Sequence, residues 1–241
     1  MIGRAEVRTH YLTDAHHDVF VACTTPPGRA RRAVVLCPPF GYEHVCAQRT
    51  MRVMAEQMAA HGHATVAFDP AGRRNSGRRG VVGDELAIWV HSATMAVQHA
   101  ATLADDGVVL VGLRMGSLVA TLVAEQLGAD ALVLFDPAPS GRRHLRELRS
   151  LQLMGVASTD LPGDPGGVNL LGEPLSSATV AALDRVELAR VPPPRHTLIV
   201  SRPAHAGSER LAAAWREAGA DVQTIDDPGL GEVYVLGAER S

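Results

Sequence analysis

The amino-acid sequence predicts an α/β fold in which an eight-stranded, mostly parallel β-sheet is covered by helices on both faces. Short apolar runs alternate along the chain with helix-length amphipathic stretches, the order typical of parallel sheets. The tight turn Gly112–Gly116 joins one apolar run directly to a helical pattern. The length of 241 residues fits one large domain, so we expect a single domain over residues 1–241.

The predicted strands are short and rich in Val, Ala and Leu. They occupy Glu6–Leu12, Asp18–Thr24, Ala33–Cys37, Ala64–Asp69, Val108–Val111, Ala131–Phe135, Thr197–Ser201 and Asp221–Ile225. We expect the first two to form an antiparallel pair at the edge of the sheet. Proline cannot donate a ladder hydrogen bond, so Pro38-Pro39 ends the third strand.

The predicted helices have apolar residues at helical spacing and stop signals after them. They occupy Gln48–Ala60, Asp84–Leu103, Ser117–Leu127, Arg142–Leu153, Ser176–Leu188 and Ser208–Ala218. Asp84 is suited to cap the second helix because its carboxylate accepts backbone N–H groups at a helix start. Gly128 ends the third because glycine readily adopts the left-handed conformation of a C-cap.

Residues 140–191 have a different sequence pattern from the remainder of the chain. A basic amphipathic helix is followed by the loop Asp160–Gly172, which is rich in Gly and Pro, and then by a second short helix. The proline-rich run Val191–Pro194 marks the exit from this stretch. An insertion between two strands lies over the carboxyl ends of the sheet, so we expect residues 140–191 to form a small helical lid.

Composition and charge exclude several classes of function. The formal net charge of −3 gives no overall attraction to nucleic acid or anionic membranes. No apolar run reaches the length of a membrane span, and none at the N-terminus has the length of a signal peptide. Cys23, Cys37 and Cys46 are an odd set without CxxC spacing, which favours reduced thiols and a cytoplasmic protein. The sequence shows no local pattern of a metal or cofactor site, and we expect neither. It does not predict an oligomeric state.

The turn Gly112-Leu113-Arg114-Met115-Gly116 has the spacing and setting of the G-x-S-x-G nucleophile elbow, with arginine in the place of serine. Two further motifs stand in the expected order. Pro38-Pro39-Phe40-Gly41 follows the third strand, where an oxyanion-hole loop belongs. The fourth strand is followed by Asp69-Pro70-Ala71-Gly72 and Asn75-Ser76-Gly77, a D-x-x-G-x-G-x-S-like turn in which Arg74 replaces the second glycine.

With these motifs the sequence resembles the α/β-hydrolase superfamily over nearly its whole length. Within it, the chain is most similar to the exosortase A system-associated hydrolases of the second type. The shared stretches are Pro38-Pro39-Phe40 with Glu43, Gly112-Leu113-Arg114, and Pro137 through Ser140-Gly141-Arg142 with His144-Leu145. This resemblance implies acyl esters or thioesters as ligands.

All three positions of a Ser-His-Asp triad depart from the superfamily pattern. Arginine at position 114 cannot be deprotonated and forms no acyl-enzyme. The acid usually follows the seventh strand, but Arg202–Ala206 holds no carboxylate. The histidine usually follows the eighth strand, but Asp226–Gly231 holds none. We therefore do not expect serine-type hydrolysis.

Three residues are candidates for catalytic roles, each with a structural alternative. The planar guanidinium of Arg114 suits a carboxylate, a phosphate or charge developing on an acyl substrate, and an internal salt bridge to Glu43 or Asp136 is equally open. Asp136 follows the sixth strand and is either an acid or a loop acceptor. His205 is the best-placed general acid or base, unless it is simply solvated.

The candidate substrate-binding residues gather around the same turns. They are Phe40, Gly41, Glu43, His44, Met115 and His144. Phe40 and Gly41 are expected to line the oxyanion side. Glu43 and His44 either face the pocket or lie on the surface. Two alternative nucleophiles, the Cys46 thiol and the Ser117 hydroxyl, are less favoured than packing roles.

The preferred interpretation is a hydrolase-like protein that binds an acyl ester or thioester under the lid and acts without a serine. One alternative is a non-catalytic scaffold that presents an acyl carrier protein. Another is a catalyst of acyl transfer, cyclisation or isomerisation by positioning and electrostatics. If the clusters Arg73–Arg79 and Arg142–Arg149 share one rim, they suit an acidic carrier protein or a pantetheine phosphate.

Overall fold

The computed structural model describes residues 5–79, 83–129, 131–153, 164–170 and 172–230. In this part of the chain, all eight predicted strands lie in one sheet with the order β1-β2-β4-β3-β6-β7-β10-β11. A two-residue strand, β5, pairs with His17 and Asp18 of β2, next to the stretch of β2 that pairs with β4. The bounds are β1 Glu6–Thr13, β2 His17–Thr25, β3 Ala33–Cys37, β4 Ala64–Phe68, β5 Gly77–Arg78, β6 Val108–Leu113, β7 Ala131–Phe135, β10 His196–Ser201 and β11 Asp221–Asp226.

The sheet is parallel from β4 to β11, and the predicted antiparallel edge pair is confirmed. β1 and β2 run antiparallel, with His10 opposite Val21, and β2 is antiparallel to β4. The carboxyl ends of the parallel strands therefore meet at one edge, where polar side chains from several elements can converge.

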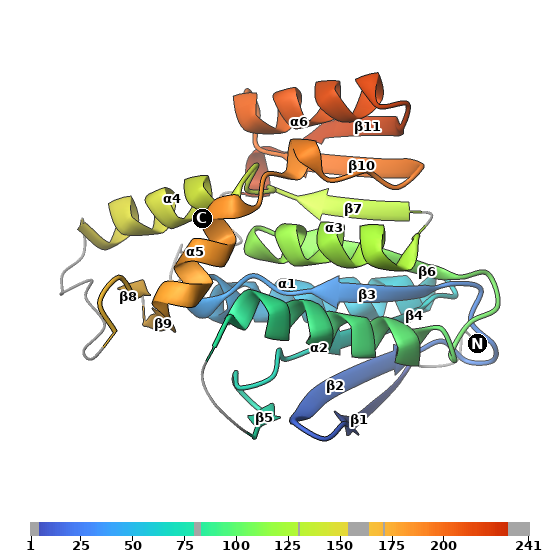
Figure 1. The fold of residues 1–241 in the computed structure, drawn as a ribbon. Helices are drawn as coiled ribbons and strands as arrows, with labels where there is room; N and C mark the ends of the chain where they lie inside the picture. Colours follow the sequence, from blue (N-terminus) through green and yellow to red (C-terminus); the bar gives the residue numbers. More distant parts are fainter. Residues whose placement is uncertain (1–4, 80–82, 130, 154–163, 171, 231–241) are drawn as a thin grey trace, which may run out of the picture.

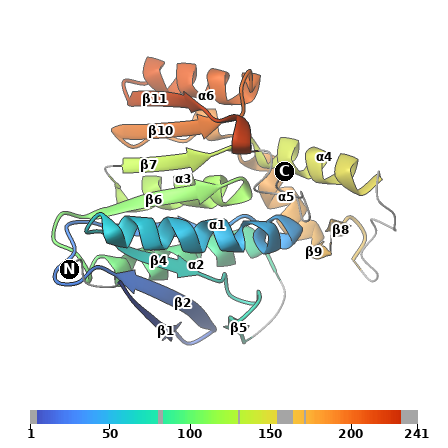
Figure 2. The same ribbon diagram turned by 180° about the vertical axis from the view of Figure 1, so that it is seen from behind.

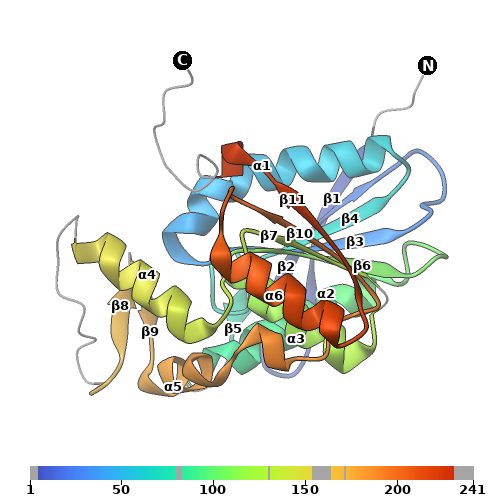
Figure 3. The same ribbon diagram turned by 90° about the horizontal axis from the view of Figure 1, so that it is seen from above.

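Helices cover both faces of the sheet, as predicted. They are α1 Gly41–Ala60, α2 Glu85–Ala100, α3 Met115–Leu127, α4 Gly141–Leu153, α5 Ser177–Arg185 and α6 Ala206–Glu217, with a 3-10 turn at Leu188–Arg190. The helix α1 lies on one face, and α2, α3 and α6 lie on the other (Figures 1 to 3). The larger apolar core lies between the sheet and α2 and α3, and a smaller one lies beneath α1.

Helix α1 begins at Gly41, before the predicted Gln48. The prediction missed the first two turns because they carry a polar residue on the buried face. Glu43 is buried and continues the buried stripe of Ala47, Met51 and Ala55 at four-residue spacing. An apolar period cannot detect a glutamate at such a position. The first turn of α1 therefore places the Glu43 carboxylate at the edge of the sheet where the parallel strands have their carboxyl ends.

Helix ends agree with the capping residues that the sequence predicts. The Asp84 carboxylate accepts hydrogen bonds from the backbone N–H groups of Leu86 and Ala87, and Gly128 has the left-handed φ of 64°. Ser176 is the N-cap of α5, not its first residue, and its hydroxyl accepts from Thr179 N.

The described part of residues 140–191 lies at the carboxyl ends of the strands, where α4, α5 and a small hairpin stand together (Figures 1 and 2). The hairpin pairs β8 Val168–Leu170 with β9 Glu173–Leu175 and replaces part of the predicted loop Asp160–Gly172. Its strands are too short for an alternating pattern to be recognised in the sequence. Residues 160–163 and 171 of that loop lie outside the described residues. The role of this region as a lid stays a prediction.

Candidate functional site

The backbone at Arg114 has the geometry of a strained elbow. Arg114 lies between β6 and α3 with φ 52° and ψ −115°, a region that L-residues rarely adopt. A Cβ on Gly116 would lie 2.2 Å from the carbonyl oxygen of Cys37, and one on Gly112 would lie 2.5 Å from Ser117 Cα. Both glycines are therefore needed for the turn to pack against β3 and α3, as the motif predicts.

The guanidinium of Arg114 lies inside a cluster of three carboxylates. Nε donates to Glu43 Oε1 at 2.9 Å, and Nη2 donates to Glu147 Oε2 at 3.0 Å. Nη1 lies 3.4 Å from both the carbonyl oxygen and Oδ2 of Asp136. Of the two roles open for Arg114, the structure places it in internal salt bridges, with Glu147 as a third partner. We call Arg114, Glu43, Asp136 and Glu147 the elbow ion cluster.

Burial and charge act in opposite directions on the members of this cluster. Burial raises the pKa of Glu43 above its ordinary value, although Arg114 opposes the shift. Burial acts the same way on Glu147, but the Arg114 and Arg143 cations prevail and lower its pKa. Arg114 itself is buried, and the surrounding carboxylates outweigh that burial and raise its pKa. The cation is thus fixed, and of Glu43 and Glu147 it is Glu43 that protonates more readily.

His144 is a buried neutral histidine beside the elbow ion cluster. It lies on α4 with 1% of its surface exposed, and its Nε2 is 3.9 Å from Glu43 Oε2. Burial, with the positive charge of Arg114, lowers the pKa of His144 to about 3. Glu43 Oε2 and His144 Nδ1 find no hydrogen-bond partner among the described residues. The elbow ion cluster therefore contains polar atoms that remain open to a further donor or acceptor.

Asp136 and His205 come together, but not as part of a catalytic relay. Asp136 Oδ2 lies 3.1 Å from Arg202 Nε, and Oδ1 lies 4.0 Å from His205 Nδ1. The same nitrogen of His205 is 2.7 Å from Ser208 Oγ. A relay needs the hydroxyl and the carboxylate on opposite ring nitrogens, so Ser208, His205 and Asp136 do not form one. Burial lowers the pKa of His205, which leaves the ring neutral at neutral pH.

Among the described residues, the space beneath α4 is almost filled. A cavity of about 10 Å³ lies there, lined by five of the six predicted substrate-binding residues: Phe40, Gly41, Glu43, Met115 and His144. Such a volume holds at most one water molecule. The Phe40 ring stacks on Trp89 with centroids 4.1 Å apart and so forms part of the packing.

His44, the sixth predicted residue, lies elsewhere. It lines a groove of about 660 Å³ on the α1 face of the sheet, together with Phe20, Met51 and Phe68. Its Nε2 is 3.8 Å from Asp69 Oδ1, and burial lowers its pKa to about 4. Residues 43 and 44 are adjacent on a helix and point about 100° apart, so they cannot both face one pocket.

Of the two alternative nucleophiles, Ser117 has a structural role and Cys46 lies in a different part of the structure. The Ser117 hydroxyl is buried and donates to the carbonyl oxygen of Gly112, which ties α3 to β6. Cys46 lines the groove that contains His44, away from the cavity beneath α4. Neither side chain occupies the elbow position.

Sequence reasoning missed two charged members of the site, Glu147 and Arg202. Glu147 is the only acid on the otherwise basic helix α4 and follows Arg143 by four residues. A single negative charge on a basic helix was the signal in the sequence that could have identified Glu147. Arg202 directly follows β10.

No protein-family model matches the sequence, and no curated protein matches it. Solved structures do. A hypothetical protein from Pseudomonas aeruginosa is 16% identical with a TM-score of 0.66, and the match covers 98% of this chain and 90% of that one. Est1E from Butyrivibrio proteoclasticus, solved with ferulic acid bound, is 18% identical with a TM-score of 0.59, covering 88% and 86%. A thioesterase domain from the curacin biosynthetic pathway is 14% identical with a TM-score of 0.57, covering 95% of each chain.

These likenesses establish that the chain has the α/β-hydrolase fold. At such identities they carry no information about its reaction. Among the described helices, none combines the length and apolarity that crossing a membrane requires.

Proposed function

We propose that this protein is a non-catalytic member of the α/β-hydrolase fold, a scaffold that binds an acidic partner such as an acyl carrier protein. The observation that carries the proposal is the elbow ion cluster. It occupies the position at which a hydrolase of this fold presents its nucleophile, and arginine cannot attack an ester or thioester.

The charges around Arg114 argue against its use as an anchor for an anionic ligand. Three cations, Arg114, Arg143 and Arg202, stand against the three carboxylates of Glu43, Asp136 and Glu147. The formal charges balance, so an entering anion would have to displace a buried carboxylate from the guanidinium. Among the described residues, the cavity of about 10 Å³ beneath α4 is also too small for an acyl chain.

The partner is expected at the outer face of α4. Arg142, Arg146 and Arg149 follow one another at helical spacing, and both Arg142 and Arg146 are exposed. Arg142 also pairs with Asp184 at 3.8 Å, and in the second arginine cluster Arg73 and Arg78 pair with Glu85. Basic helical faces of this kind attract acidic proteins through salt-sensitive contacts.

Two assays test the proposal. The purified protein is incubated with p-nitrophenyl esters and acyl thioesters, and separately with a serine-reactive fluorophosphonate probe. We expect no turnover above that of Arg114→Ala and no labelling. Labelling of Ser117, or turnover that Arg114→Ala abolishes, would overturn the proposal.

Partner binding is measured as salt-dependent retention of purified holo-acyl carrier proteins. Arg146→Glu is expected to weaken retention, and the matched control Arg210→Glu, an exposed arginine on α6, is expected to leave it unchanged. Equal retention by both variants would exclude α4 as the docking face.

A second candidate function rests on His205 and Asp136. Asp136 Oδ1 is buried and has no hydrogen-bond partner among the described residues, while the neutral His205 ring lies 4.0 Å away. A rotation of the ring that gives up the 2.7 Å contact of Nδ1 with Ser208 Oγ would bring Nδ1–H onto Asp136 and leave Nε2 to activate water against an acyl ester or thioester. Turnover that His205→Gln abolishes and Arg114→Ala retains would favour this candidate over the scaffold.

A further inference from the structure

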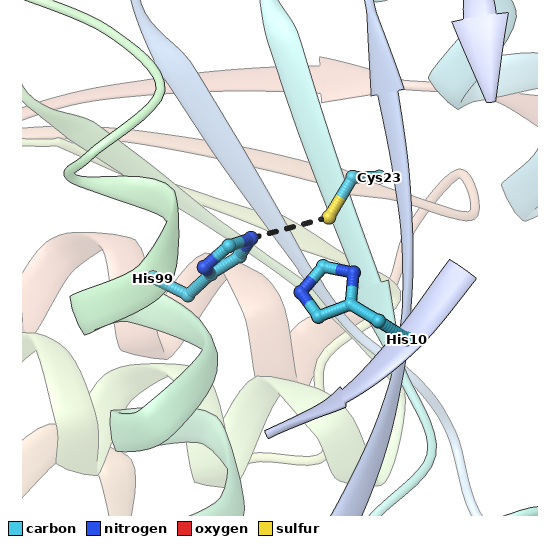
Figure 4. A group of neighbouring side chains, drawn as sticks. All are labelled: His10, Cys23 and His99. Atoms are coloured by element: carbon cyan, nitrogen blue, oxygen red, sulfur yellow. Dashed lines mark hydrogen bonds between the residues drawn. The ribbon is translucent and has the colours of Figure 1, made fainter. Parts of the chain in front are cut away.

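A second group of reactive side chains lies at the edge of the sheet, between β1, β2 and α2. None of these elements contributes a charged residue to the elbow ion cluster, so this group is independent of the proposed function. The side chains are His10 on β1, Cys23 on β2 and His99 on α2, and their ligand atoms all lie within 4.8 Å of one another. Figure 4 shows the three side chains turned towards one another from three separate elements.

The strand register explains why two of them share a face. His10 is opposite Val21, and residues opposite each other in an antiparallel pair lie on the same side of the sheet. Cys23 is two residues beyond Val21, so it lies on that side as the diagonal neighbour of His10. Val19, Val21 and Cys23 form a buried row on this side, and His99 is near the end of α2 that meets it.

The distance between Cys23 and His99 is compatible with a shared zinc ion. Cys23 Sγ lies 3.5 Å from His99 Nε2. Zinc–sulfur and zinc–nitrogen bonds of about 2.3 and 2.1 Å at a tetrahedral angle place the two ligand atoms roughly 3.5 Å apart. The rings of His10 and His99 are 4.8 Å apart between centroids and meet edge to face, and the ligand atoms of all three residues lie within 4.8 Å of one another. Thiolate with imidazole is a ligand set that zinc prefers.

We propose that His10, Cys23 and His99 form a zinc-binding site that fastens the β1–β2 edge to α2. The protein supplies three ligands, and His10 is partly exposed, which leaves a fourth position to water. Binding converts the Cys23 thiol to a zinc-bound thiolate and releases one proton per ion to solvent. No sequence motif announces this site, because its ligands are far apart in the chain and follow no zinc-ligand spacing.

A neighbouring group, Asp14, His17 and His91, has the same kind of composition but is explained without a metal. Asp14 Oδ1 accepts the backbone N–H groups of His16 and His17 at 2.7 and 2.8 Å, which forms the turn between β1 and β2. Its Oδ2 is 2.6 Å from His91 Nε2. This carboxylate is thus already used by the hairpin, whereas the first group would give up the single hydrogen bond between Cys23 Sγ and His99 Nε2.

The test is a zinc titration of the whole purified chain, competed against a chromophoric chelator. We expect one zinc ion per chain and a thermal unfolding midpoint that rises with zinc. His10→Ala, Cys23→Ser and His99→Ala should each weaken binding by more than about 100-fold, since losing even an outer-shell partner costs about 10- to 100-fold. His10→Ala alters a partly exposed side chain, and circular dichroism verifies that each variant is folded.

Cobalt identifies the sulfur ligand. The Co²⁺-loaded protein should show a thiolate-to-cobalt absorption in the near ultraviolet that Cys23→Ser removes and the matched control Cys46→Ser retains. Three results would each overturn the proposal. They are the absence of saturable zinc binding, unchanged affinity in His10→Ala and His99→Ala, and loss of binding in His91→Ala alone, which would assign the ion to the neighbouring group.

Discussion

Replacement of Arg114 by methionine removes the cation of the elbow ion cluster while keeping a long side chain. The side chains of Glu43 and Asp136 are 5% and 2% exposed, and that of Glu147 is 29% exposed. Breaking a buried ion pair by removing one partner costs about 3–5 kcal/mol because a charge is left uncompensated. Arg202 still neutralises Asp136, so we expect a loss of about 3 kcal/mol at pH 7, at the lower end of that range.

For a chain of this size, that loss lowers the unfolding midpoint by roughly 6–12 °C. The sign of its pH dependence follows from Glu43, whose pKa is raised by burial even with Arg114 present. A raised carboxyl pKa contributes stability below its unfolded value and loses it as pH rises through the folded value. Without Arg114 this effect grows, so the deficit of the variant is smallest near pH 4 and largest at pH 7.

Urea denaturation of the wild-type protein and Arg114→Met at several pH values measures this deficit. Arg114→Met/Glu43→Gln should regain part of the stability at pH 7, because one uncompensated carboxylate is gone. Arg210→Met on the exposed face of α6 serves as the control and should change stability little. Equal stability of Arg114→Met and wild type at pH 7, or a deficit independent of pH, would refute the reasoning.

Three further predictions concern the scaffold of the site. Gly116→Ala should prevent native packing, since its Cβ would lie 2.2 Å from a backbone oxygen. The Cβ of Gly128→Ala meets open space, so this variant should lose only about 1–2 kcal/mol of stability through left-handed backbone strain. Thermal melts compare the two variants. Asp84→Ala should lose about 1 kcal/mol in urea denaturation, and Asp84→Asn, which can still cap α2, should lose less. Burial lowers the pKa of His144 to about 3. The neutral ring therefore contributes stability that is present above pH 6.5 and is lost as pH falls towards 3. His144→Gln should flatten the profile of stability against pH measured between pH 6 and 4.

The fold and the position of the elbow could be predicted from the sequence alone. Alternating apolar runs and amphipathic stretches predicted the eight main strands, and Gly112 and Gly116 predicted an elbow whose tightness the structure accounts for. These features are local, because a strand, a cap or a glycine turn is encoded by residues close together in the chain. The same local evidence singled out Arg114 at the centre of that turn.

The surroundings of Arg114 became known only from the packing of the whole chain. Its partners come from α1, from the end of β7 and from α4, and no local pattern specifies that Glu43, Asp136 and Glu147 meet there. The start of α1 had the same difficulty, since a buried glutamate interrupts the apolar period that reveals a helix. The grouping of His10, Cys23 and His99 likewise depends on strand register and on the packing of α2. Contacts between distant segments arise from packing of whole elements, and the spacing of residues along one segment does not encode them.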